Sequence, residues 1–171
     1  VTSIGNYAFR DSQFDGAFEC PNLQKVGFYA FYSSQFDGAF ECPNLTTVGD
    51  GAFFYSNFTG SLSLPMCTYV GTDAFTSSNF SGSLSLPSCT YVGTNAFQFS
   101  NFSGSLNLPM CTYIGVYAFR NSNFNSITIG ANATLGTGCI GAHSTEFIQD
   151  YAANGKLAGT YIWDGQHWIY Q

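Results

Sequence analysis

The sequence has little charge, and least of all positive charge. Asp, Glu, Lys and Arg make up 8% of the 171 residues, where about a quarter is usual, and four Lys and Arg face ten Asp and Glu. The resulting net charge of −6 argues against the basic patch that a nucleic-acid-binding protein needs. The chain also lacks an apolar run near the roughly 20 residues that cross a bilayer, so we expect no membrane span.

The motifs of enzymes are missing as well. There is no phosphate-binding loop and no nucleophile elbow. The arrangement nearest to a metal site is Cys139, His143 and Glu146, but it offers too few ligands for zinc, and packing in a terminal cap is the simpler interpretation. His167 fits a surface position on a strand. We therefore expect no catalytic residue, no metal and no cofactor.

A 22-residue period runs through the chain instead. A Val or Ile followed by Gly marks it at Ile4, Val26, Val48, Val70, Val92 and Ile114. An Ala-Phe pair, a second phenylalanine, a glycine and a proline recur in the same step. Such self-similarity is the signature of a tandem array, in which each unit buries its apolar face against its neighbours.

The length and content of the unit predict a mainly β, leucine-rich-repeat solenoid. About 20 to 29 residues is the range of such repeats, whereas helical-pair repeats and propeller blades are longer. In the segment GSLSLP, Leu84 and Leu86 alternate with Ser83 and Ser85, which is the pattern of a short strand with one buried face. A second short extended piece, CTYVG, follows the proline. Coils stacked at about 4.8 Å would give six coils a length of roughly 29 Å.

The repeating side chains indicate what lies inside and at the corners. Most phenylalanines fall into three columns, which we interpret as an interior ladder and not as an aromatic ligand cage. A serine column and a neighbouring amide column fit turns in which short polar side chains satisfy backbone groups and bond along the stack. The serine column consists of Ser12, Ser34, Ser56, Ser78, Ser100 and Ser122.

The units resemble the BspA-like leucine-rich repeat, in particular the stretch ECPNLTTVGDGAF. That pattern is a strand ending in Pro, then Ile-Gly or Val-Gly, then Ala-Phe, and the resemblance covers roughly residues 1–129. It implies a protein similar in role to adhesins on the surfaces of host-associated bacteria, with an extracellular or cell-surface location. The departures are a unit of 22 residues where 23 is more usual, and Phe or Cys at some core sites.

The repeats divide the chain into two parts. Residues 1–129 form about six coils, which begin midway through a coil, so we expect the natural protein to continue upstream. Residues 130–171 form a terminal coil and a C-terminal cap. Just before this boundary the rhythm slips by one residue, so that Ile127 and Ile129 arrive one position early.

The cap is expected to contain a helix and a hairpin. Ser144 or Thr145 suits the helix N-cap, and Gly155 suits the stop after its end. Asp164 and Gly165 lie between two β-rich arms, which indicates a hairpin. We assign residues 147–171 to the cap, and the resemblance supports this because similar tails end many bacterial BspA-like proteins.

The cysteines occupy leucine positions. Cys67, Cys89 and Cys111 stand in the column of Leu23 and Leu45. Buried free thiols that act as small apolar side chains are therefore expected. Bridges between neighbouring coils stay possible on distance, although a parallel ladder offers poor torsion angles for them.

The candidate binding residues are those expected to point outward. On the strands they are Glu19, Glu41, Ser63, Ser85 and Asn107, and beside the Val-Gly column they are Tyr69, Tyr91 and Tyr113. Stacked glutamates hint at a cation or a basic partner, or are two solvated carboxylates copied by duplication. The tyrosines suit recognition, although packing along the rod is an equal alternative.

These observations favour a non-catalytic scaffold that is secreted or lies at the cell surface. As the resemblance implies, its function would be adhesion to a protein or glycan on a host or neighbouring cell. A structural spacer for an upstream domain is one alternative. Another is a wall-binding module built on the hairpin aromatics Tyr161, Trp163, Trp168 and Tyr170. The open first coil, from Val1 to Phe18, also predicts end-to-end self-association.

Overall fold

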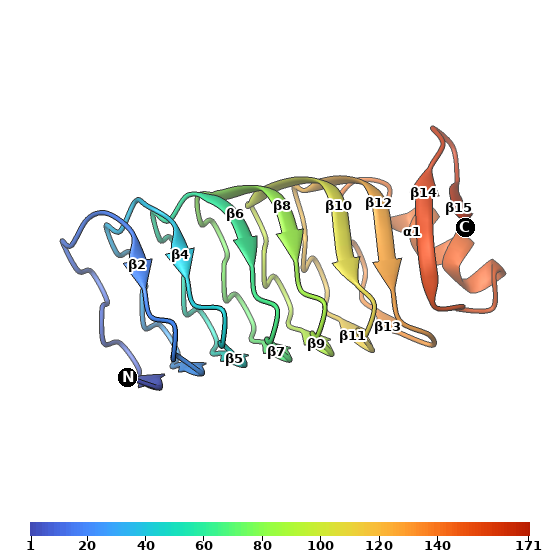
Figure 1. Cartoon of the computed structure of the whole chain (residues 1–171). Coiled ribbons are helices and arrows are strands. Elements are labelled where there is room, and N and C mark those ends of the chain that lie inside the picture. Colours follow the sequence, from blue (N-terminus) through green and yellow to red (C-terminus); the bar gives the residue numbers. More distant parts are fainter.

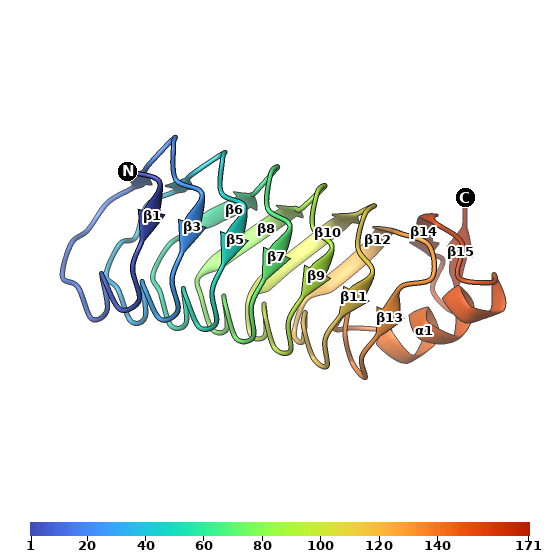
Figure 2. The ribbon, with the colours of Figure 1, turned by 90° about the horizontal axis from the view of Figure 1, so that it is seen from below.

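The computed structural model describes residues 1–171 and shows a rod of stacked coils that ends in a helix and a hairpin (Figure 1). The mainly β solenoid predicted from the period is confirmed. One side of the rod is a parallel sheet of seven two-residue strands (Figure 2). These strands are β1 (Ser3–Ile4), β3 (Lys25–Val26), β5 (Thr47–Val48), β7 (Tyr69–Val70), β9 (Tyr91–Val92), β11 (Tyr113–Ile114) and β13 (Thr134–Leu135).

The other main side, called here the side of the longer strands, carries two separate sheets. The strands of its larger sheet have three to eight residues, whereas the two strands of its smaller sheet have two residues each. Its larger sheet has the order β15-β14-β12-β10-β8-β6, and its smaller sheet pairs β2 with β4. The strands are β2 (Phe18–Glu19), β4 (Phe40–Glu41), β6 (Gly60–Ser63), β8 (Phe80–Ser85), β10 (Asn101–Leu108), β12 (Asn123–Ile129), β14 (Gly159–Trp163) and β15 (Trp168–Tyr170). Only β14 and β15 run antiparallel.

The recurring glycine after Val or Ile allows the coils to approach closely. A Cβ added to Gly93 would lie 2.6 Å from the carbonyl carbon of Gly71, and one added to Gly115 would lie 2.5 Å from the Thr94 nitrogen. Both contacts are with backbone, so a side chain there would force one coil to shift. Glycine in this column is therefore required by the packing of one coil on the next.

The Ala-Phe column forms the centre of the core. Phe31, Phe53, Phe75, Phe97 and Phe119 are fully buried. Their rings stack from coil to coil with centroids 4.8 to 5.1 Å apart. A single hydrophobic cluster extends from the first coil into the cap, which confirms the phenylalanine columns as interior packing.

The serine column behaves as expected in the later coils only. Ser78 and Ser100 share a hydrogen bond of 3.2 Å between their hydroxyls, and Ser122 donates to the Ser100 carbonyl at 3.2 Å. The hydroxyls of Ser34 and Ser56 are buried without a partner. The hydrogen-bonded stack therefore begins at the fourth unit.

The one-residue slip near residue 124 is absorbed as an irregularity in the sheet. Between β10 and β12 the register shifts at Gly104 and Ser105, after which Leu106 faces Ile127. The apolar side chains therefore stay on the inner face. The altered strand β12 then pairs with the antiparallel β14 of the cap.

The cap contains α1 (Ser144–Ala153), and its N-terminus differs from the expectation. The N-cap is His143, in the left-handed conformation at φ 56°, and no side chain caps the helix. Ser144 cannot take that role because its hydroxyl accepts from the Ile140 N–H and donates to the Cys139 sulfur. The helix also starts before residue 147, where we had begun the cap. Gly155, at φ 67°, ends it as predicted.

The hairpin also differs in detail from the prediction. Trp163 pairs with Trp168, so the loop is Asp164 to His167 and His167 lies in the turn, not on a strand. The Asp164 carboxylate accepts hydrogen bonds of 2.8 Å from the N–H groups of both Gln166 and His167. These bonds lower the pKa of Asp164. A carboxylate thus closes the turn.

The helix is fastened to the terminal coil by Tyr151. Its buried hydroxyl donates to the Gly130 carbonyl at 2.6 Å and accepts from the Ala133 N–H at 3.0 Å. Phe147 and Trp168 pack beside it and are also buried. The helix is too short to span a membrane, and no other helix exists in the chain.

Candidate binding faces

The predicted binding residues lie on two faces of the rod, not on one. Glu19, Glu41, Ser63, Ser85 and Asn107 belong to the side of the longer strands (Figure 1). Tyr69, Tyr91 and Tyr113 belong to the seven-stranded sheet (Figure 2). A ligand that covers one sheet face therefore does not reach the other.

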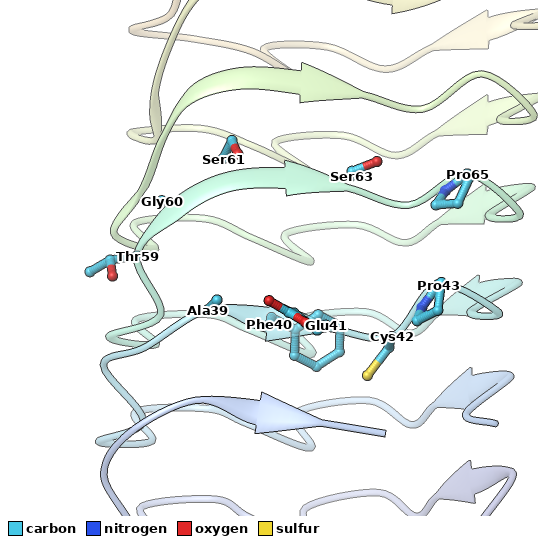
Figure 3. Close-up of a pocket in the computed structure, with 10 residues that line it drawn as sticks. All are labelled: Ala39, Phe40, Glu41, Cys42, Pro43, Thr59, Gly60, Ser61, Ser63 and Pro65. Atoms are coloured by element: carbon cyan, nitrogen blue, oxygen red, sulfur yellow. The ribbon is translucent and has the colours of Figure 1, made fainter. Parts of the chain in front are cut away.

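The first face is hollowed between β4 and β6. A cavity of about 510 Å³ opens there, and Figure 3 shows the residues that line it, which come from the two facing strands and the segments next to them. Glu41 lies on the β4 side, and Ser61 and Ser63 lie on the β6 side. Of these, Glu41 and Ser63 were predicted as binding residues, and the structure brings them together.

The hollow exists because the strand ladder is interrupted. The Cys20 N–H donates to the Glu41 carbonyl at 3.1 Å, and the Leu64 N–H donates to the Ser85 carbonyl at 3.1 Å. The equivalent bond, from the Cys42 N–H to the Ser63 carbonyl, is missing. Backbone polar groups at the interruption are therefore open to a ligand.

The interruption coincides with a change in the core. Phe40 of β4 is followed, in the same column, by the smaller Leu62 of β6. Both side chains are buried. Coils with phenylalanine in this column thus meet coils with leucine, and the two-stranded sheet ends at that junction.

The acidic pair forms a short negative stripe on this face. Glu19 and Glu41 are register partners on β2 and β4, and both are exposed. No third His, Cys, Asp or Glu joins them in a group that could hold a metal ion. The neighbouring Asp37 is engaged elsewhere, because it accepts a bond of 2.8 Å from the Gly16 N–H.

The tyrosine ladder packs against itself. The rings of Tyr69, Tyr91 and Tyr113 stack with centroids 4.9 and 4.7 Å apart and within 8° of parallel. Their faces are therefore covered by one another, and a row of edges and hydroxyls is left at the surface. Burial by the neighbouring groups raises the pKa of Tyr69, and the Asp50 carboxylate adds to this.

The thiols of the leucine column are buried and unbridged, as predicted. Cys67, Cys89 and Cys111 are free and buried, and each sulfur donates to the carbonyl two residues on, at 3.2 to 3.3 Å. Burial raises the pKa of Cys67 and of Cys111 to about 11. Thiols of this kind are poor nucleophiles at neutral pH.

The arrangement of Cys139, His143 and Glu146 does not assemble into a ligand set. Cys139 is buried and bonded to Ser144, and burial raises its pKa to about 11. The His143 ring stacks on Trp163 with centroids 4.0 Å apart. The structure therefore shows these residues packing within the cap.

The repeat geometry agrees with a family comparison. A model described as a BspA type leucine-rich repeat region matches residues 1–103 and 24–145, with six copies. The chain belongs to this family. BspA-type leucine-rich repeat proteins are typically surface-associated, non-catalytic, protein-binding scaffolds. Neither a curated protein nor a solved structure matches the chain.

The BspA-type coils also carry an aromatic corner that the sequence patterns did not single out. Tyr7, Arg10, Tyr29 and Tyr32 line a cavity of about 270 Å³ there. These residues change type from coil to coil, so a search for repeating columns passes over them. The available signal was tyrosine at a position where other coils have Gly51, Asp73 and Asn95.

Proposed function

We propose that the chain is a non-catalytic binding scaffold, secreted or held at a cell surface, that adheres to a protein or glycan of a host matrix or a neighbouring cell. The contact face is the outward side of the longer strands, and it comprises Glu19, Glu41, Ser63, Ser85 and Asn107. The hollow between β4 and β6 carries the proposal, because it joins an acidic side chain to hydroxyls and open backbone groups.

The chemistry of this face indicates the kind of partner. The glutamates and the net charge of −6 favour a basic group on the ligand. The serines and open backbone groups supply hydrogen bonds to a ligand that lies between β4 and β6 like an added strand. A basic, extended segment of a protein partner fits this combination.

The wall-binding alternative has little support from the hairpin. Tyr161 and Trp168 are buried against α1, with 0% and 1% of their surfaces exposed. Trp163 stacks on His143. The hairpin aromatics therefore form the core of the cap, and Tyr170 is the one left well exposed.

Binding of the 171-residue chain to immobilised fibronectin, collagen and laminin tests the proposal. We expect the double variant Glu41→Lys, Ser63→Arg to bind at least about tenfold more weakly, because it reverses the charge and fills the hollow. Its thermal midpoint should stay nearly unchanged, since both side chains are exposed.

Asn107→Arg is the matched control, because it places the same side chain in the same column two coils away from the hollow. It should weaken binding much less than the double variant. If the unaltered chain binds neither these proteins nor host cells, the scaffold proposal fails and the spacer alternative gains. If the control weakens binding equally, the contact is not centred on the hollow.

A further inference from the structure

A second cavity lies at a corner of the first two coils, away from both sheet faces. It has a volume of about 270 Å³ and is lined by Tyr7, Arg10, Tyr29 and Tyr32. The lining residues come from the segments that follow β1 and β3. Drug-sized ligands occupy about 300 to 1,000 Å³, so this cavity suits a single ring of a larger molecule.

Aromatic rings hold the charged group of this cavity in place. The Arg10 guanidinium carbon lies 5.7 Å from the centre of the Tyr7 ring and 5.2 Å from that of the Tyr32 ring. The Arg10 Nε bonds to the Asp11 carboxylate at 3.2 Å. The two terminal nitrogens make no hydrogen bond within the chain. They are therefore free to bind an oxyanion in a fork.

The tyrosines give the cavity flat walls with hydroxyls at their rims. The rings of Tyr7 and Tyr29 are parallel within 5°, with centroids 5.9 Å apart, and Tyr32 meets Tyr29 edge-on at 5.7 Å. Unlike the interior phenylalanines, Tyr7 and Tyr29 are exposed to 46% and 36%. The facing sides of these two rings cover each other, and the remaining exposed part of each ring is open to a ligand.

The backbone beneath these rings is unfavourable for tyrosine. Tyr7 and Tyr29 have φ of 60° and 51°, in the left-handed region that large side chains avoid. The same position in later coils is Gly51, Asp73 and Asn95, which adopt this conformation more readily. Contacts with Phe28 and Tyr32 offset part of this cost. The turn itself does not require tyrosine at this position, which agrees with a role in binding.

The same combination occurs once more, around the other arginine of the chain. Arg120 stands in the column of Arg10, and its guanidinium lies 5.1 Å from the Tyr117 ring centre and 5.8 Å from that of Phe99. Tyr117 is also in the left-handed region, at φ 54°. Arginine in this protein thus accompanies strained surface tyrosine at both places. The two sites are five coils apart, about 24 Å at about 4.8 Å per coil.

We propose that the cavity of Tyr7, Arg10, Tyr29 and Tyr32 binds a sugar that bears a carboxylate. The exposed parts of the tyrosine rings contact the C–H groups of a sugar ring, and the free side of the guanidinium pairs with the carboxylate in a fork. A neutral sugar would leave the guanidinium without a partner, and a polyphosphate carries more negative charge than the single Arg10 can pair in a chain of net charge −6. This site is separate from the proposed protein-binding face.

Titration of the 171-residue chain with single sugars, followed by NMR of the backbone amides, tests the proposal. The acidic probes are methyl β-D-glucuronide and 3′-sialyllactose, and their neutral counterparts are methyl β-D-glucoside and lactose. We expect at least one acidic probe to shift the amides of the four lining residues. Its neutral counterpart should bind at least about tenfold more weakly, because it lacks the charged hydrogen bonds. Which acidic probe binds distinguishes a uronic acid from a sialic acid.

Three variants sharpen this test. Arg10→Gln should weaken binding of the acidic probe about tenfold. Asp11→Asn removes a carboxylate beside the bound anion and should strengthen binding roughly twofold to fivefold. Tyr7→Asn places a residue tolerant of this backbone at the wall of the cavity, and it should weaken binding while the amide spectrum outside the corner stays the same.

The control variant is Ser63→Arg, which changes the proposed protein-binding face and should bind the acidic probe as well as the unaltered chain does. The proposal is overturned if no probe shifts the corner amides, or if acidic and neutral probes bind equally. It is also overturned if Asp11→Asn weakens binding. None of these outcomes bears on binding to matrix proteins.

Discussion

Cysteine takes the place of leucine in the middle of this rod, and the thiols therefore lie in the apolar core, away from water. Leu23 and Leu45 are fully buried in the column that Cys67, Cys89 and Cys111 continue. The substitution was readable from the sequence, because the period aligns these positions without reference to a structure. The consequence for thiol chemistry depends on burial, which the structure supplies.

We expect alkaline pH to destabilise the protein through these thiols. Their ordinary pKa is 9.0, and in the fold burial raises the pKa of Cys67 and Cys111 to about 11. The folded state therefore keeps protons that the unfolded state releases, so the free energy of unfolding is unaffected below about pH 9 and falls as pH rises towards 11. Each thiol contributes a loss of about 1 kcal/mol per pH unit in this window.

Urea denaturation between pH 7 and 11 measures this effect. The variant Cys67→Ala, Cys111→Ala is the control, and it should lose less stability between pH 9 and 11 than the unaltered chain, although it starts from a lower value. An equal loss in both proteins would place the alkaline sensitivity elsewhere.

The tyrosine ladder can be tested with a pair of triple variants. If the exposed edges of Tyr69, Tyr91 and Tyr113 contact the ligand through their hydroxyls, changing all three to Phe should weaken adhesion while the stack and the thermal midpoint are retained. Changing all three to Ser should also remove two ring stacks, at about 0.5 to 1.5 kcal/mol each, and lower the midpoint. Full adhesion by the Phe variant would make the ladder purely structural. Solid-phase binding and thermal melting give the two readouts.

Within the coil, the glycine after Val or Ile sets how closely successive elements approach. Gly93 has the Gly71 backbone 2.6 Å from where a Cβ would lie, whereas Gly5, in the same column of the first coil, has nothing within 4 Å. Gly93→Ala should therefore destabilise the chain by about 1 to 3 kcal/mol or more, because backbone must shift. Gly5→Ala should leave stability within about 0.5 kcal/mol. Similar losses in chemical denaturation of the two variants would contradict this account.

The strands followed from the sequence more fully than the ends of the elements did. Alternation of Leu84 and Leu86 with serine specified a buried face, and the early Ile127 specified the register shift. The helix N-cap was misassigned because Ser144 is taken by Cys139, a contact that the sequence does not display. The hollow depends on a mismatch between neighbouring coils, which becomes visible only when the coils are stacked.

The candidate binding residues, too, were predicted only in part from the sequence. Outward columns were predictable, since Ser63 and Glu41 follow from alternation along a strand. Their meeting in one hollow was not, because it results from a missing backbone bond at Cys42. The corner around Arg10 was not predicted at all, because tyrosine and arginine occur in only some of the coils, and the turn signal of Gly51, Asp73 and Asn95 in the same column was not used.

At the scale of the whole molecule, the two ends of the rod differ. The cap closes one end, while in the 171-residue chain β1 and β2 each have a neighbour on one side only. Phe14 is exposed to 64% there, and Val1 to 83%. Unpaired strand edges beside apolar side chains are a template for association.

We therefore expect the 171-residue chain to pair end to end through Val1 to Phe18 as its concentration rises. Sedimentation velocity across a concentration series measures this, with Phe14→Lys as the variant that should shift the equilibrium towards monomer. A single monomeric species at every concentration would refute it.

The interrupted ladder between β4 and β6 also has a mechanical consequence. Backbone bonds between coils run along the rod, so a force that pulls its two ends apart acts on the coil interfaces in series, and an interface with missing bonds is the weaker one. The junction between β4 and β6 lacks the Cys42 to Ser63 bond, whose equivalents are present at the junctions on either side. Under tension at a surface, the rod would extend there before the cap or the tightly stacked central coils yield, and the hollow would widen with the applied force.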